Sequence, residues 1–133
     1  MSVLDRCEKF LEEVQNHLRD ELLPFWLTRG VDKEFGGFLT YLDRNGNPTG
    51  ETVKTHLCQT RCIYTYSSVH RAQIGQGEFL KIAKQGVDFV LDNFWDDKHG
   101  GWFWTAQQDG TVAELLATKG ESLAVDQPIL SFA

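Results

Sequence analysis

Residues 54–67, with the sequence KTHLCQTRCIYTYS, predict a helix that is apolar around most of its circumference. Its apolar positions, extended by one turn, are Leu57, Cys58, Cys62, Ile63, Tyr66 and Val69. A helix of this kind is normally buried, yet this one carries Lys54, Gln59 and Arg61. Because arginine is always charged and rarely fully buried without a partner, Arg61 either meets a carboxylate in a core or lines a polar cavity inside the fold.

Further amphipathic helices are predicted on both sides of this segment. Before it, apolar residues recur every three or four positions from Val3 to about Leu27, and Pro24 is expected to kink or close that helix. After it, the same spacing predicts a helix from about Glu78 to Phe94. Ser122 to Ala133 is expected to begin another apolar helix, with Pro128 tolerated in a first turn.

Two glycine pairs, 36–37 and 100–101, reveal an internal repeat with an offset of 64 residues. The same offset pairs Asp32 with Asp96, Phe38 with Trp102 and Gly46 with Gly110. Each unit consists of a predicted helix, an aspartate, a strand that begins Gly-Gly-aromatic, an Asx-Gly turn and a second helix. Residues 37–42 and 101–106 are therefore expected to be equivalent strands of short hairpins. The pattern predicts one domain, 1–133, built from repeat units of about 3–72 and 78–133.

Composition narrows the class of protein. The formal net charge is −6, which argues against nucleic-acid binding because that needs a basic patch. The sequence has no apolar run long enough to span a membrane and no apolar leader, and its three cysteines suggest free thiols in a reducing cytoplasm. Cys58 and Cys62 share a helix face, but a closed zinc site takes four ligands, so neither a metal nor a cofactor is expected.

Several of these residues together resemble the N-terminal part of the N-acylglucosamine 2-epimerase family, which includes cellobiose 2-epimerase and mannose isomerase relatives. In the first repeat unit they are Asp32 with Gly36-Gly37-Phe38, the turn at 43–46, and Lys54, Gln59 and Arg61. The resemblance extends along essentially the whole chain through residues 100–104, 109–110 and Asp126-Gln127. The resemblance implies a mainly α fold of the (α/α)6-barrel type, an α/α toroid of which this chain would supply about two helix–hairpin–helix units. The chain is therefore expected to be a fragment of a longer barrel, or to complete itself with other copies.

The resemblance also implies an activity, epimerisation at C2 of a free sugar or aldose–ketose isomerisation. Both reactions remove a proton next to the open-chain carbonyl and build negative charge on its oxygen, which a fixed cation stabilises. Arg61 matches a family arginine that points into the pocket, so it is the catalytic candidate. Lys54, Gln59, Trp102 and Trp104 are candidates for sugar binding, although both tryptophans equally suit packing of the hairpin.

The chain also departs from the family pattern. None of its histidines, His17, His56, His70 and His99, matches the two catalytic histidines of the family, and Val125 stands where the family commonly has a tyrosine. The isolated chain is therefore expected to be inactive. Three functions remain open: part of a sugar epimerase or isomerase, a catalytically dead half-barrel that binds carbohydrate or protein, and a helical repeat with no pocket. The expected partners are a small sugar and either further copies of the chain or the rest of the barrel.

Overall fold

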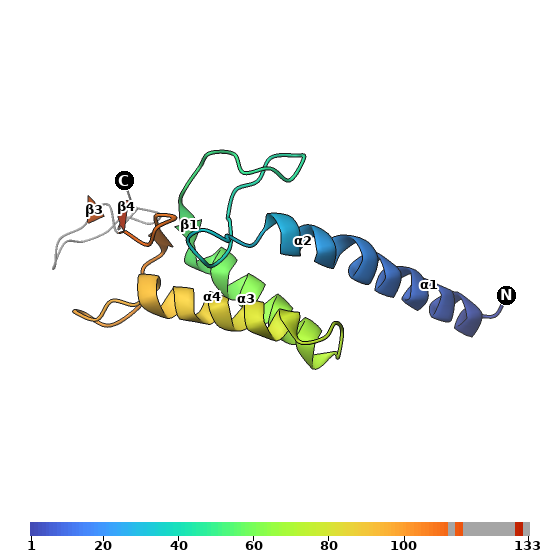
Figure 1. The fold of residues 1–133 in the computed structure, drawn as a ribbon. Helices are drawn as coiled ribbons and strands as arrows, with labels where there is room; N and C mark the ends of the chain where they lie inside the picture. Colours follow the sequence, from blue (N-terminus) through green and yellow to red (C-terminus); the bar gives the residue numbers. More distant parts are fainter. Residues whose placement is uncertain (112–113, 116–129, 132–133) are drawn as a thin grey trace, which may run out of the picture.

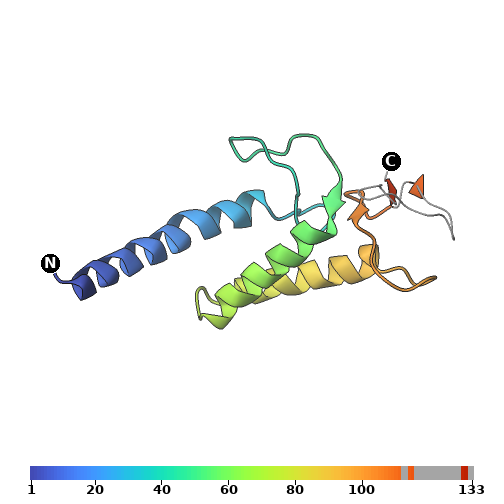
Figure 2. The same ribbon diagram turned by 180° about the vertical axis from the view of Figure 1, so that it is seen from behind.

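The computed structural model describes residues 1–111, 114–115 and 130–131, and this part of the chain is mainly helical. Its helices are α1 (Val3–His17), the π-helical turn η1 (Leu18–Leu22), α2 (Leu23–Arg29), α3 (His56–Arg71) and α4 (Glu78–Phe94). Helices α3 and α4 pack on each other, while α1 runs away from them (Figures 1 and 2). Two antiparallel pairs of two-residue strands complete the fold: β1 (Lys54–Thr55) with β2 (Thr105–Ala106), and β3 (Glu114–Leu115) with β4 (Leu130–Ser131). None of the described helices is long and apolar enough to cross a membrane.

The first helical stretch begins at a capping box and contains one irregular turn. The Ser2 hydroxyl accepts a hydrogen bond from the Asp5 amide, and the Asp5 carboxylate accepts one from the Ser2 amide, which satisfies two free donors at the helix start. The turn η1 widens the helix just before Pro24. Proline lacks an amide proton and crowds the carbonyl four residues earlier, so a wider turn lets the helix continue through it. Pro24 therefore neither closes nor breaks the predicted helix.

The middle helix begins two residues later than the sequence predicted, and it is buried on one side only. Lys54 and Thr55 form β1, and the Thr55 hydroxyl then caps α3 by accepting a hydrogen bond from the Cys58 amide. The buried residues of α3 are Gln59, Tyr66 and Val69, whereas Leu57, Arg61 and Tyr64 are exposed. The expectation of a helix enclosed on nearly all sides is therefore wrong for the described residues.

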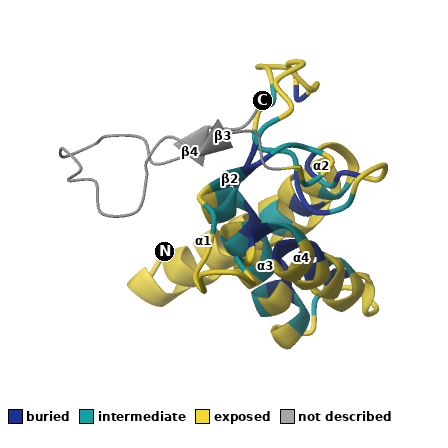
Figure 3. Ribbon diagram, turned by 90° about the vertical axis from the view of Figure 1, so that its left-hand side faces the viewer, coloured by how far each residue is buried: buried dark blue, intermediate teal, exposed yellow. Residues whose placement is uncertain are grey.

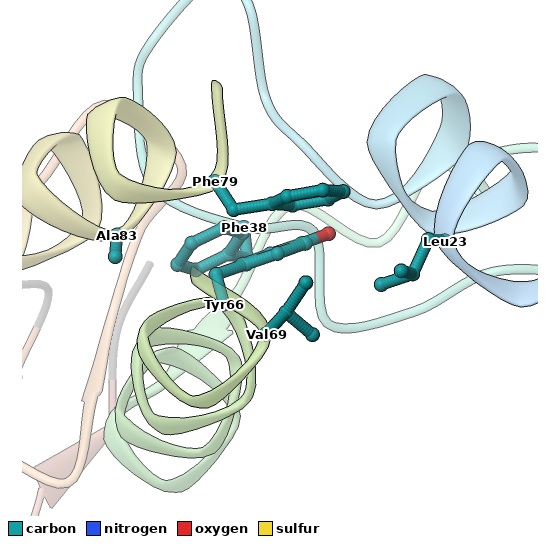
Figure 4. Packing of buried hydrophobic residues seen from close by; sticks show 6 residues of the cluster. All are labelled: Leu23, Phe38, Tyr66, Val69, Phe79 and Ala83. Carbon is teal, nitrogen blue, oxygen red and sulfur yellow. The ribbon is translucent and has the colours of Figure 1, made fainter. Parts of the chain in front are cut away.

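The main apolar core lies where α3 and α4 meet the loop that follows α2. The rings of Phe38, Tyr66 and Phe79 form a stack, with centroids 5.5 Å apart for Phe38 and Tyr66 and 6.0 Å apart for Tyr66 and Phe79. Val69 lies beside this stack, and Leu23 reaches toward it from α2 (Figure 4). By contrast, none of the residues of α1 is buried (Figure 3).

The two glycine-pair loops carry equivalent hydrogen bonds at the 64-residue offset. The Asp32 amide donates to the Gly37 carbonyl over 3.0 Å, and the Asp96 amide donates to the Gly101 carbonyl over 3.1 Å. Two further backbone bonds correspond in the same way: Leu39 to Gly30 matches Phe103 to Phe94, and Gly46 to Asp43 matches Gly110 to Gln107. The two glycine pairs have positive φ angles throughout, which glycine adopts without strain.

The strand expectations were partly wrong. Instead of strands at 37–42, the first loop has single bridges between Val31 and Phe38 and between Leu42 and Pro48. The strand pair β1–β2 joins the two repeats rather than closing a hairpin within one of them. The predicted helix over 122–133 lies largely outside the described residues, but Leu130 and Ser131 form β4, so this part of that expectation is wrong. Much of the second unit, 78–133, beyond residue 111 also lies outside them.

Candidate functional site

A groove of about 310 Å³ lies between α2 and α3, and Arg61 is on its wall. Its lining is mostly apolar and includes Leu22, Trp26, Leu39 and Tyr66. Arg61 is exposed, and no carboxylate of the described residues pairs with its guanidinium. Neither alternative for this cation describes the structure: Arg61 is exposed beside an open, mostly apolar groove, not in a buried ion pair and not in a polar cavity inside the fold.

Lys54 lies elsewhere, in a buried polar network that ties the two repeat loops together. Its ammonium group donates to the Asp32 carboxylate over 2.7 Å and to the carbonyls of Gly36 and Gln108 over 2.6 Å and 3.3 Å. It also lies 4.4 Å from the centroid of the Phe89 ring. These three bonds use all the donors of a lysine ammonium, so the structure gives Lys54 partners within the chain.

Asp32 is the acidic centre of that network. One oxygen of its carboxylate accepts the amides of Glu34 and Phe35, and the other accepts Lys54 and the Gln108 side chain. Burial on its own would raise the pKa of Asp32, but these four hydrogen bonds outweigh it and hold the pKa below the ordinary value. The first loop therefore stabilises Asp32 in its charged, deprotonated form.

Gln59 anchors the first loop to α3. Its side-chain oxygen accepts the Phe38 amide over 2.8 Å, and its side-chain nitrogen donates to the Phe38 carbonyl over 2.7 Å. Gln59 is fully buried, and a methyl group added at Gly37 would meet its oxygen at 2.6 Å. Successive helix residues are rotated by about 100°, so Gln59 points toward this loop while Arg61 lies on the other side, at the groove. The predicted contact of Lys54 and Gln59 with a sugar stays untested.

The two tryptophans do not line the groove beside Arg61. Trp102 is half-exposed and packs near the start of α3, 5.3 Å from His56 and 5.0 Å from Trp95 between ring centroids. Trp104 is exposed, and its carbonyl accepts the His56 amide over 2.8 Å. Trp102 and Trp104 thus lie near the N-terminal end of α3, apart from the residues that line the groove. Their predicted role in sugar binding also stays a prediction.

The ionisable groups near the groove do not include a histidine. None of the four histidines of the chain lines it; His99 instead contacts the Asp96 carboxylate at 3.0 Å in the second loop. The polar groups of the groove lining, apart from Arg61, are the hydroxyls of Thr40, Thr65 and Tyr66 and the thiols of Cys58 and Cys62. Burial raises the pKa of Tyr66 to about 12, so its hydroxyl is neutral near pH 7. The groove as described offers a cation, neutral hydroxyls and two thiols.

Sequence reasoning missed two features of this region. Asp32 and Gln108 were not recognised as the partners of Lys54, because they lie 22 and 54 residues from it along the chain. A lysine within a predicted buried helix was the available signal, because a buried ammonium requires a carboxylate somewhere in the fold. The joint position of Cys58 and Cys62 in the groove was also missed, although their helical spacing was noticed.

Comparison with known proteins shows sequence similarity to sugar 2-epimerases over most of the chain. A family model described as N-acylglucosamine 2-epimerase (GlcNAc 2-epimerase) matches residues 36–118. A cellobiose 2-epimerase from Bacteroides fragilis is 30% identical over 114 residues, which cover 86% of this chain and 28% of that protein. An N-acylglucosamine 2-epimerase from Bos taurus is 34% identical over 74 residues, covering 54% of this chain and 17% of that protein.

The fold agrees with these sequence relationships. The structure of a cellobiose 2-epimerase from Spirochaeta thermophila superposes with a TM-score of 0.74 at 26% identity, covering 84% of this chain and 27% of that chain. The chain therefore spans less than a third of the length of the relatives and the solved structure named here.

Proposed function

Since the chain belongs to the N-acylglucosamine 2-epimerase family, we propose that it forms the arginine-bearing part of a sugar 2-epimerase or aldose–ketose isomerase. In this proposal the groove side of α3 faces the sugar in an (α/α)6 barrel, with α3 as one of the inner helices. The observation that carries the proposal is the position of Arg61, an unpaired cation among the described residues on the wall of a groove. An unpaired guanidinium next to a cavity is available to a ligand, whereas one in an ion pair is not.

The proposed role of Arg61 is electrostatic. Removal of the proton next to the open-chain carbonyl moves negative charge onto the carbonyl oxygen, and the guanidinium donates hydrogen bonds to that oxygen as the charge develops. A group of this kind contributes about 3 kcal/mol of transition-state stabilisation, by analogy with a single oxyanion donor. Return of the proton to C2 from the opposite face gives the 2-epimer of the aldose. Its return to C1 instead gives the corresponding ketose.

Lys54 and Gln59 support this role indirectly. Gln59 fixes the backbone of Phe38, and Lys54 joins Asp32 in the first loop to Gln108 in the second. Both bonds hold the loops at the N-terminal end of α3, the end from which Arg61 projects into the groove. We propose that these two residues position α3, and that any sugar contact they make is secondary to this.

The isolated chain is expected to be inactive toward sugars. An epimerase needs a group of near-neutral pKa on each face of the sugar to take and return the proton. No histidine lines the groove, and its two thiols lie together on α3, so they reach the sugar from one side only. The purified chain should therefore not exchange the C2 proton of mannose or N-acetylglucosamine in heavy water. Exchange above the rate of the buffer would contradict this.

A chimaera tests the role of Arg61 itself. The residues of the Bacteroides fragilis cellobiose 2-epimerase that align with this chain are replaced by this chain, and 2-epimerisation of cellobiose is measured. We expect an active chimaera in which Arg61→Ala lowers kcat by about 10²–10³-fold. Arg71→Ala is the matched control, because Arg71 is exposed at the far end of the same helix, and it should retain full activity.

Two outcomes of this experiment separate the alternatives. Full activity of the Arg61→Ala chimaera, at unchanged thermal stability, would overturn the proposed role of Arg61. A folded but inactive chimaera would favour the catalytically dead half-barrel, and titration of the chain with cellobiose followed by NMR would then distinguish carbohydrate binding from protein interaction.

A further inference from the structure

Two thiols lie side by side in the wall of the groove. Cys58 and Cys62 are one turn apart on α3, both are partly buried, and both belong to the groove lining. The Cys58 sulfur also lies 3.7 Å from the Leu39 carbonyl oxygen, which fixes its position at the groove. The third cysteine, Cys7, is exposed on α1 and does not line this groove.

The closeness of the two thiols shifts the pKa of each in opposite directions. A hydrogen bond between them lowers the pKa of Cys58 to about 7 and, together with burial, raises the pKa of Cys62. Loss of the first proton is therefore easy because the remaining thiol stabilises the thiolate, while a second negative charge beside it is disfavoured. The thiolate is the nucleophilic and ligating form of cysteine, so the pair offers a reactive sulfur near neutral pH.

The helix does not suit a direct disulfide between these residues. Side chains four positions apart on a helix have their Cβ atoms about 5–6 Å apart, whereas a disulfide requires about 3.5–4.5 Å. A single atom bonded to both sulfurs at about 2.3 Å, the length of a zinc–thiolate bond, removes this mismatch because it lengthens the bridge. Thiolates prefer soft centres, and two ligands do not complete a closed zinc site.

We propose that Cys58 and Cys62 form a two-thiol site for one soft, thiophilic centre of the trivalent organoarsenical class, seated in the groove. The dihydroxyarsine condenses with both thiols: two arsenic–sulfur bonds form, two arsenic–oxygen bonds break, and the two thiol protons leave with the hydroxides as two molecules of water. Arsenic stays trivalent throughout, so no oxidant or reductant is needed. The site rests on the groove and the thiols alone and does not depend on the proposed function.

The groove has room and a surface for the organic substituent. An apolar cavity of about 150 Å³ accommodates benzene, and this groove measures about 310 Å³. Leu22, Leu23 and Trp26 from the helix opposite the thiols supply apolar contact for an aryl ring. A bound aryl group would lie in the groove that Arg61 also lines.

The test uses phenylarsine oxide as the probe on the chain reduced with a phosphine. Intact mass is measured after one equivalent is added, and iodoacetamide then labels the thiols that remain free. We expect one phenylarsenic group per chain, with Cys58 and Cys62 protected from alkylation and Cys7 fully alkylated. The adduct should survive a monothiol in excess and be removed by a dithiol.

Variants separate a bridged site from a reaction at single thiols. Cys58→Ser and Cys62→Ser should each weaken binding by about 10²-fold or more, because the second bond of a two-point attachment is lost, and Cys7→Ser should leave binding unchanged. Alkylation of Cys58 and Cys62 in the presence of the probe, in the unsubstituted chain, would overturn the proposal whether or not the variants fold. So would a dependence of the adduct on Cys7.

Discussion

At the scale of single residues, Asp32 and Asp96 occupy equivalent places but differ in burial. Each carboxylate accepts two amides of its own loop, but only Asp32 also binds Lys54 and the Gln108 side chain. The Asp32 side chain is 4% exposed and that of Asp96 is 20% exposed. Loss of one partner of a buried ion pair leaves an uncompensated charge and costs about 3–5 kcal/mol.

We therefore expect Asp32→Asn to lower the free energy of unfolding by about 3 kcal/mol or more, and Asp96→Asn to lower it by much less. Urea denaturation followed by circular dichroism at pH 7 measures both variants against the unsubstituted chain. Equal losses for the two variants would mean that the buried bond to Lys54 adds nothing to the loop itself.

The same residue gives the stability a defined dependence on pH. The pKa of Asp32 is lowered in the folded chain, so its contribution is complete above its unfolded pKa of about 3.9 and is lost as the pH falls through the folded pKa. The difference in unfolding free energy between the unsubstituted chain and Asp32→Asn should accordingly be constant near neutral pH and shrink over an interval of acidic pH that begins at about pH 4. A difference that stays constant over this interval would contradict the assignment.

At the scale of secondary-structure elements, Gly86 sets the distance between α3 and α4. A methyl group at this position would lie 2.6 Å from the Phe38 ring and 2.8 Å from the Ile63 side chain. Alanine is favoured over glycine by about 1 kcal/mol in an exposed helix interior, but here the added methyl overpacks the contact, which typically costs about 1–3 kcal/mol. We expect Gly86→Ala to lower the melting temperature.

Gln85 provides the matched control for that substitution. It lies on the exposed side of α4, so Gln85→Ala should change the free energy of unfolding by no more than about 0.5 kcal/mol. Both variants are measured by thermal unfolding followed at 222 nm. A Gly86→Ala protein more stable than the unsubstituted chain would show that the helices separate without cost.

The elements differ in how far the sequence predicted them. The 78–94 helix agrees with its prediction at both ends, because its apolar spacing and the glycines before it are local signals. The start of α3 was wrong by two residues because Lys54 and Thr55 pair with β2, about 50 residues away. Arg61 was expected in the pocket from the family resemblance, whereas the helix pattern alone favoured a buried ion pair; the structure has it exposed beside the groove. The start of α3 and the surroundings of Arg61 both depend on contacts between segments that are far apart in the sequence. Local sequence patterns do not predict such contacts.

At the scale of the whole molecule, α1 presents an apolar surface that no other described element covers. Its apolar residues Leu4, Cys7, Leu11 and Val14 are spaced by three and four, the seam of a coiled coil, and all of them are exposed. From the sequence alone, two other apolar surfaces are expected to mediate association: the α4 face of Phe79, Val87 and Leu91, and the apolar residues at 129–132. Phe79 of that expected α4 face is buried in the core, although Val87 and Leu91 are exposed, and residues 129–132 lie mostly outside the described part.

We expect the chain to self-associate through α1. The continuous helical stretch from Val3 to Arg29 is about 40 Å long at 1.5 Å per residue, and pairing along it would cover an area approaching the roughly 800 Å² per partner of a standard interface. Leu11→Glu places a charge in this seam and should shift the chain to monomer at tens of micromolar, as measured by light scattering after gel filtration. Asn16→Glu adds the same charge off the seam, so it should leave the association intact. A chain that is monomeric before any substitution, or that both variants dissociate equally, would show that α1 is not the contact surface.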